Sequence, residues 1–152
     1  MPTHFQFIKT PLLSVGYESH APVNAGPDAP VIMLLHGWPD STRTWASVVP
    51  HLTAAGYRVI VPALRGFAPT TFLHRDTPRT GQLAALGRDL LDLIAALKID
   101  KPILVGHDWG ARAVANACGL VPNLASHMVL ISVAYGANNP SQAISMAQAR
   151  RY

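Results

Sequence analysis

Short apolar runs alternate with amphipathic segments along most of this chain. Each run has the length of a strand, and the apolar character of its whole length is typical of a strand that is buried on both faces. The runs lie at residues 31–35, 58–62, 102–107 and 127–133. Buried strands that alternate with helices predict an α/β fold, with a mainly parallel sheet and helices on both of its faces.

The intervening segments predict the helices. Residues 81–97 carry apolar side chains at three- and four-residue steps, which form one stripe along a helix. Residues 42–55 and 111–120 predict two more helices, ended by Gly56 and by the sequence GLVP. Two strands are expected before the first buried run, at residues 5–9 and 12–18. A chain of 152 residues with this order of elements is the size of one domain.

Unusual residues follow three of the predicted buried strands. HGWPDS (residues 36–41) and ALRGFAPTT (63–71) come directly after an apolar run, and GHDWG (106–110) follows Val105 at the end of another. In sheets of this kind, chemistry gathers at the carboxyl ends of the strands. We therefore expect the three loops to converge on one site.

The sequence VGHDWGA, residues 105–111, has a glycine two positions before and two positions after Asp108. A sharp turn from strand to helix leaves no room for Cβ atoms at these flanking positions, and it holds the central residue in a strained conformation. Such a turn would lift the side chain of Asp108 above the edge of the sheet. The N-terminus of the following helix favours a negative charge there.

This turn resembles the nucleophile elbow of the α/β-hydrolase fold, with aspartate in place of the more common serine. HGWPDS looks like the oxyanion loop of that family, and it stands one strand, one helix and one strand before the elbow, as in the family. HGWP together with GHDWGA is similar to the epoxide hydrolase branch, whose nearest relatives are haloalkane dehalogenases. The resemblance runs from about residue 5 to the last residue.

The resemblance implies that Asp108 is a nucleophile. A carboxylate attacks saturated carbon when the leaving group is good or strained, and the product would be an alkyl ester on Asp108. Water activated by a histidine would then add to the ester carbonyl, and the oxyanion would need hydrogen-bond donors. In the family these donors are backbone N–H groups, which correspond here to Trp38 and Trp109, and the Trp38-Pro39 bond is often cis. The supporting residues would be His36, Gly37, Pro39, Gly106, His107 and Gly110.

Several of these residues have other interpretations. Asp108 could simply cap the following helix, and Trp38 and Trp109 could be core aromatics. His36 and His107 could be taken for catalytic bases, but the family uses both structurally. In the family the first braces its own loop, and the second points to the other side of the backbone from the nucleophile.

Two more residues near these motifs are expected to have structural roles. Trp45 is expected to pack its helix rather than line a pocket, and Arg65 to be an ion partner within the fold. The family usually has an acid two residues before this arginine, where this chain has Ala63. It often has glycine where this chain has Ala68.

The family places an acid and then a histidine base after the elbow. After Asp108 this chain has no Asp or Glu, and its only later histidine, His127, begins a predicted strand and so belongs to the wrong end of the sheet. The resemblance therefore implies that residues 1–152 are a partial core domain, the N-terminal half of the fold, truncated after about strand six and before the cap domain that carries tyrosine acids. Turnover by this chain alone is not expected. Its last strand would be an exposed apolar edge through which copies could self-associate.

Composition argues against several other classes of protein. The chain is 49% hydrophobic and 13% charged, which is typical of a packed globular protein. Its net charge of +4 comes from scattered basic residues, so nucleic-acid binding is not expected. The single cysteine, Cys118, is expected on a buried helix face and fits a reducing compartment. No signal peptide or membrane span is recognised, which predicts a cytoplasmic protein, and the resemblance implies neither cofactor nor metal.

Three hypotheses for the function remain. The first is an epoxide hydrolase-like enzyme that converts a small hydrophobic epoxide and water to a vicinal diol. The second is a haloalkane dehalogenase acting on a halide substrate by the same nucleophile. That family often has Asn after the HG of its oxyanion loop, and one branch has an acid after strand six, where VAYGANNP (133–140) has none. The third, from another class, is a non-catalytic scaffold or binding protein that has kept the fold.

Overall fold

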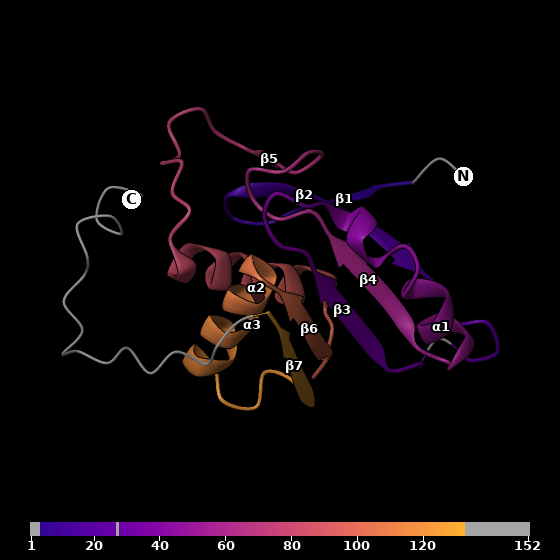
Figure 1. Ribbon diagram of the computed structural model, residues 1–152. Coiled ribbons are helices and arrows are strands. Elements are labelled where there is room, and N and C mark those ends of the chain that lie inside the picture. Colours follow the sequence, from indigo (N-terminus) through magenta and orange to yellow (C-terminus); the bar gives the residue numbers. More distant parts are fainter. Residues whose placement is uncertain (1–3, 27, 133–152) are drawn as a thin grey trace.

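Seven strands form one mixed sheet in this computed structural model, which describes residues 4–26 and 28–132 (Figure 1). In chain order the strands are β1 (Gln6–Lys9), β2 (Leu13–His20), β3 (Val31–Leu35), β4 (Arg58–Pro62), β5 (Thr71–Phe72), β6 (Ile103–His107) and β7 (His127–Ile131). The helices are the short 3₁₀ helix η1 (Thr42–Trp45) and the α-helices α1 (Val49–Ala54), α2 (Leu83–Leu97) and α3 (Trp109–Leu120).

The central strands of the sheet are parallel. The order across the sheet is β1-β2-β4-β3-β6-β7, with β5 paired to β2. β4, β3, β6 and β7 run parallel, whereas β1 and β5 pair antiparallel with β2, and β2 with β4. Ile103 of β6 aligns with Ile32 of β3 and with His127 of β7, so the carboxyl ends of these strands meet at one edge. HGWPDS follows β3 and ALRGFAPTT follows β4 at that edge, and GHDWG spans the end of β6 and the start of α3 there, as predicted.

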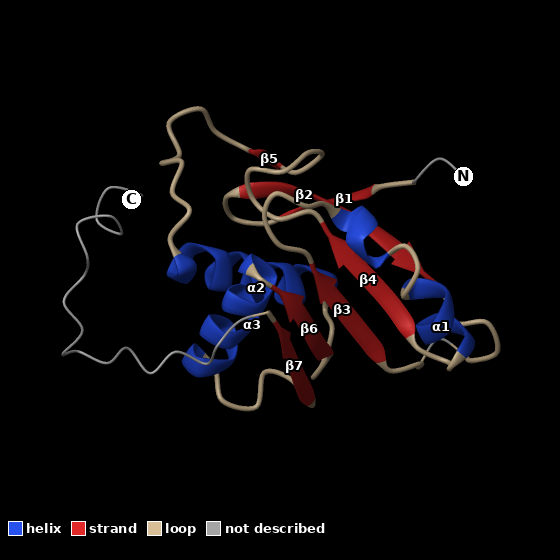
Figure 2. Ribbon diagram, in the orientation of Figure 1, coloured by secondary structure: helices blue, strands red, loops and turns tan. Residues whose placement is uncertain are grey.

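The sheet separates two apolar cores, because successive side chains on a strand point to opposite faces. Met33 and Leu35 of β3 belong to a core cluster with α2 and α3. Ile32 and Leu34 belong to a second cluster with Trp45 of η1 and with α1. In Figure 2 the blue ribbons of α2 and α3 lie together, and α1 lies apart from them beside β4. The prediction of a mainly parallel sheet with helices on both faces is confirmed.

The apolar stripe of α2 faces the core, with four buried residues: Leu86, Leu90, Leu93 and Ile94. Gly87 lies on the same face, where a Cβ atom would come within 2.5 Å of Oδ1 of Asn116 on α3. The two helices therefore pack closely at this glycine. Leu83 lies within the predicted stripe of residues 81–97 and is the first residue of α2, but it is 40% exposed, so the buried stripe begins one turn later.

Two elements differ from the sequence-based prediction. The helix expected over residues 42–55 is divided into η1 and α1. Pro50 has no N–H to donate to residue 46, so a continuous α-helical ladder cannot pass this point. β5 is too short for any periodicity to predict, since it has two residues.

β7 forms one edge of the sheet within the described residues. It pairs with β6, and three of its apolar side chains are exposed: Met128, Val129 and Ile131. The apolar edge strand expected from the sequence is therefore present in the sheet. The end of that predicted strand, residue 133, and the segment 133–140 lie outside the described residues. Across residues 4–26 and 28–132, no helix has the length and apolar character needed to cross a membrane.

Candidate active site

Asp108 lies at the turn between β6 and α3, at the carboxyl edge of the sheet. Its backbone angles are φ 51° and ψ −111°, a conformation that residues other than glycine rarely adopt. Its N–H donates to the carbonyl of Ile131 at 3.0 Å, and its own carbonyl accepts from the N–H of Arg112 at 3.1 Å. A strained backbone conformation is thus held in place by hydrogen bonds to β7 and α3.

The glycines on either side of Asp108 lie where no side chain fits. A Cβ atom on Gly106 would overlap the backbone N of Ala111 and come within 2.5 Å of its Cα. A Cβ atom on Gly110 would overlap the carbonyl O of Leu35, at the end of β3, and lie 2.6 Å from its carbon. The spacing of the two glycines therefore reflects close backbone packing on both sides of the turn, as the sequence predicts.

The HGWPDS loop contacts Asp108 directly. The N–H of Trp38 donates to Oδ1 of Asp108 at 2.9 Å. A Cβ atom on Gly37 would lie 2.6 Å from Cβ of Asp108, so only glycine lets the loop approach this closely. The bond from Trp38 to Pro39 is cis, as the resemblance implies, and the Trp38 side chain is 67% exposed. The loop thus presents a backbone donor, rather than a buried ring, to the carboxylate.

The side chain of Asp108 does not cap α3. Asp108 occupies the N-cap position, but its carboxylate makes no capping hydrogen bond to the helix backbone. A capping aspartate would accept from the N–H of the second or third helical residue. The carboxylate instead accepts from Trp38, which argues against the capping interpretation. Trp109, the first residue of α3, carries one of the N–H groups that have no acceptor within a helix.

His36 is completely buried and braces its own loop. Its Nε2 accepts from the N–H of Leu64 at 3.1 Å, and its Nδ1 donates to the carbonyl of Gly37 at 2.9 Å. Because a backbone N–H can only donate, Nε2 carries no proton and the ring is neutral. Burial lowers the pKa of His36, while the bond to Gly37 and the nearby charge of Asp40 act in the opposite direction. With both ring nitrogens bonded to the backbone, His36 cannot serve as a base for Asp108.

The structure also places four other residues that are named in the sequence analysis. Trp45 is 5% exposed and belongs to the core cluster of η1 and α1, so its packing role is confirmed. His107 ends β6, and its Nδ1 is buried without a hydrogen-bond partner in the described part of the chain. Cys118 is half-buried on α3, and burial raises the pKa of its thiol, which opposes formation of a reactive thiolate. His127 starts β7, at the opposite edge of the sheet from Asp108, as predicted.

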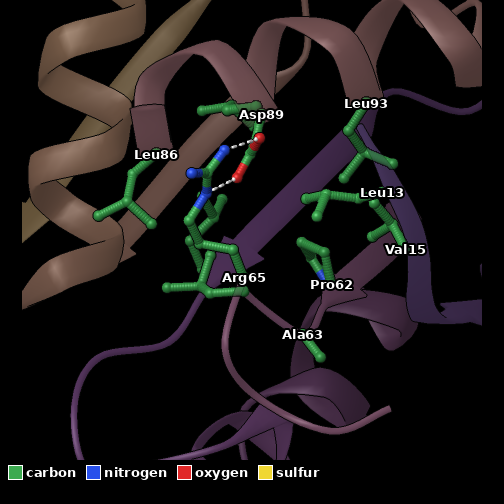
Figure 3. Close-up of a pocket in the computed structure, with 11 residues that line it drawn as sticks. Leu13, Val15, Pro62, Ala63, Arg65, Leu86, Asp89 and Leu93 are labelled. Carbon is green, nitrogen blue, oxygen red and sulfur yellow. Dashed lines mark hydrogen bonds and ion pairs between the residues drawn. The ribbon is translucent and has the colours of Figure 1, made fainter. Parts of the chain in front are cut away.

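Arg65 forms a buried ion pair with Asp89 of α2 (Figure 3). Nε and Nη2 of Arg65 donate to the two carboxylate oxygens at 2.5 and 2.6 Å. The structural ion pair expected for Arg65 is confirmed. Beside it lies a cavity of about 20 Å³, which Ala63 helps to line and which has room for roughly one water molecule. This cavity is far smaller than a substrate pocket.

Three contributors to the site are missing from the sequence-based prediction. Leu64 and Ile131 act through backbone atoms, which residue type does not reveal. Asp89 could have been found, because it lies three residues after Leu86 and four before Leu93, within the apolar stripe of its helix. A charge in such a stripe indicates a buried partner.

Comparisons with known proteins give matches over most of the chain. A family model described as alpha/beta hydrolase fold matches residues 30–152. Epoxide hydrolase 3 of Siraitia grosvenorii is 37% identical over 127 residues, which is 83% of this chain and 39% of the relative. A crystal structure of a candidate epoxide hydrolase from Klebsiella pneumoniae is 40% identical, with a TM-score of 0.77, over 82% of this chain and 40% of that one. The structure of epoxide hydrolase I of potato (Solanum tuberosum) is 25% identical, with a TM-score of 0.79, over 93% of this chain and 43% of that one. The chain thus spans about two fifths of the length of these relatives.

Proposed function

This chain belongs to the α/β-hydrolase fold family, and from that membership we propose that it carries the nucleophile of an epoxide hydrolase-like enzyme. The observation that supports the proposal most strongly is the hydrogen bond from the Trp38 N–H to Oδ1 of Asp108 at the strained elbow. An aspartate held in this way suits attack on saturated carbon. The names of the relatives favour an epoxide over a halide as the electrophile.

In the first step, Asp108 opens the epoxide. Oδ1 already accepts the Trp38 N–H, so Oδ2 is the oxygen that attacks one carbon of the ring. The carbon–oxygen bond of the ring breaks, and its electron pair goes to the ring oxygen, which takes a proton from water or from an acid. The product is a 2-hydroxyalkyl ester of Asp108. Relief of ring strain drives the step.

In the second step, water adds to the carboxyl carbon of the ester. Negative charge develops on Oδ1, where the Trp38 N–H already donates, and we assign the N–H of Trp109 as the second donor. When this intermediate collapses, the bond from the carboxyl carbon to Oδ2 breaks and its electron pair goes to Oδ2, which takes up the proton that the base removed from the water, and the diol leaves. The water needs a histidine base with an acid to orient it, and the sequence after Asp108 has no Asp or Glu. We therefore expect the 152-residue chain to be alkylated once and to release diol very slowly.

The proposal is tested by the mass of the intact chain after incubation with styrene oxide. We expect one adduct on the wild-type protein and none on Asp108→Asn, because asparagine tolerates the positive φ but is not a nucleophile. Asp100→Asn is the matched control, since Asp100 is exposed before the start of β6, away from the elbow, and this variant should still form the adduct. Circular dichroism checks that all three proteins are folded.

The outcomes separate the three hypotheses for the function. Faster alkylation by 1-bromohexane than by styrene oxide would favour the dehalogenase. A folded chain that reacts with neither compound would support the non-catalytic scaffold. An adduct that persists in Asp108→Asn would show that another residue is the reactive one.

A further inference from the structure

Arg65 holds a segment of backbone as well as Asp89. Its third donor, Nη1, bonds the carbonyl of Thr80 at 3.1 Å, just before α2 begins. The Arg65 side chain is 5% exposed, so these bonds form largely out of water. In Figure 3 the guanidinium of Arg65 faces Asp89 on α2, below the helix. A planar fork can fix a carboxylate and a carbonyl in one geometry, which a lysine ammonium cannot.

The segment fixed by Arg65 packs against the elbow. A Cβ atom on Gly81 would lie 3.2 Å from both Cη2 and Cζ3 of Trp109, so the indole rests on the backbone of Gly81. Trp109 follows Asp108 directly, and its ring also packs against the core cluster of α2 and α3. A continuous series of contacts therefore runs from Arg65 through the Thr80 carbonyl and Gly81 to the ring of Trp109.

The neighbouring residue reaches the other side of the elbow. The N–H of Leu64 bonds His36, which in turn bonds the Gly37 carbonyl beside the Trp38 amide. Two consecutive residues after β4 thus connect to Trp38, whose N–H bonds the carboxylate of Asp108, and to Trp109, which follows Asp108 in the chain.

We propose that Arg65 is a positioning residue for the elbow: it holds residues 80–81 against the indole of Trp109 and thereby sets the Trp109 amide relative to Asp108. This inference rests on the proposed function for its effect on reaction rate. Its effect on the position of Trp109 does not depend on that function. If the ion pair were purely structural, changing Arg65 would alter the stability of the fold but neither the reaction rate nor the position of Trp109.

Arg65→Lys tests the proposal, because lysine keeps the charge beside Asp89 but cannot also fix the Thr80 carbonyl. Two quantities are measured on the full chain: the rate of ester formation on Asp108 with styrene oxide, and the ¹⁹F NMR shift of Trp109 in protein labelled with 4-fluorotryptophan. This label leaves Cη2 and Cζ3 unsubstituted. We expect the rate to fall about tenfold, since small misplacements of reacting groups are costly. The Trp109 resonance should move, while that of Trp45, in the opposite core, should not.

Gly81→Ala tests the last contact without touching the ion pair. Its Cβ would press on the indole at 3.2 Å, and φ at Gly81 is not in the positive range, so alanine is tolerated there. We expect the same shift of the Trp109 resonance and a slower reaction. This variant carries the test if Arg65→Lys does not fold. Arg88→Lys is the matched control, because Arg88 pairs with Asp92 on the exposed side of α2 and should change neither quantity.

The results distinguish failure of the positioning role of Arg65 from failure of the proposed function. If Arg65→Lys or Gly81→Ala leaves both the Trp109 resonance and the reaction rate unchanged, Arg65 is not a positioning residue. If the wild-type chain forms no ester on Asp108, the proposed function fails. In that case the Trp109 resonance alone decides the inference, and an unmoved resonance overturns it.

Discussion

His36 holds the loop that carries the Trp38 amide, and it can do so only as a neutral ring. Its Nε2 accepts the N–H of Leu64 while its Nδ1 donates to Gly37. A protonated ring donates from both nitrogens, so the Leu64 N–H would then face another donor. The geometry around Asp108 therefore depends on the protonation state of a buried residue whose two ring nitrogens are both bonded to the backbone.

This dependence predicts a loss of stability in mild acid. Burial lowers the pKa of His36 below its ordinary value of 6.5, so between the lowered value and 6.5 the unfolded chain binds more protons than the folded one. The free energy of unfolding should therefore decrease as the pH falls through this range. His36→Gln removes the titrating group and should make the decrease shallower, as measured by urea unfolding from pH 8 to pH 5. Parallel curves for the two proteins would contradict this role for His36.

At the scale of secondary-structure elements, the junction of β6 and α3 depends on glycine at two positions. Gly110→Ala would push a Cβ atom into the backbone of β3, at the carbonyl of Leu35. Neither backbone can move without breaking the sheet or the helix. We therefore expect the free energy of unfolding to fall by about 3 kcal/mol, which is at the upper end of the usual cost of overpacking.

Gly119→Ala, on the same helix, is the matched control for this prediction. Its Cβ would meet no other described residue within 4 Å, and the substitution should raise the free energy of unfolding by up to about 1 kcal/mol, because alanine favours helix. Urea unfolding measures both changes. Equal effects of the two substitutions would show that the close packing at Gly110 is not what limits this position.

Most of these elements can be predicted from the sequence, because their patterns are long enough to read. The six longer strands and the helices α2 and α3 appear within a few residues of their expected bounds. The loop between Phe72 and Leu83 has no such pattern, and yet its residues 80–81 contact both Arg65 and Trp109. Its contribution arises from backbone atoms brought together by tertiary packing, which no local pattern reveals.

At the scale of the whole molecule, β7 is an apolar strand at one edge of the sheet that residues 4–26 and 28–132 form. Val129 in the middle of β7 is 47% exposed, and an apolar edge strand favours pairing with another chain. We expect the chain to self-associate in a concentration-dependent way. Val129→Lys should weaken the association in sedimentation experiments, because a charge on an edge strand disfavours pairing. Val23→Lys, in an exposed loop, is the control, and equal association of both variants would exclude β7 as the contact.

The convergence of three loops on one edge of the sheet could also be predicted, since it follows from the parallel order of the strands. The hydrogen bond between Trp38 and Asp108, 70 residues apart in the chain, is the most specific consequence of that convergence. A base for the proposed second step could not be predicted from the sequence. Residues 109–152 contain no Asp or Glu to orient a histidine.

The chemical nature of the adduct tests the central claim most directly. An alkyl ester of a carboxylate is cleaved by hydroxylamine and leaves a hydroxamate, whereas an alkylated histidine or cysteine is stable to it. After reaction of the wild-type chain with styrene oxide, we expect one modified peptide that contains Asp108. Hydroxylamine should remove the modification and leave a hydroxamate at that residue. A modification that survives hydroxylamine, or that maps to His107 or Cys118, would contradict the assignment of Asp108 as the nucleophile.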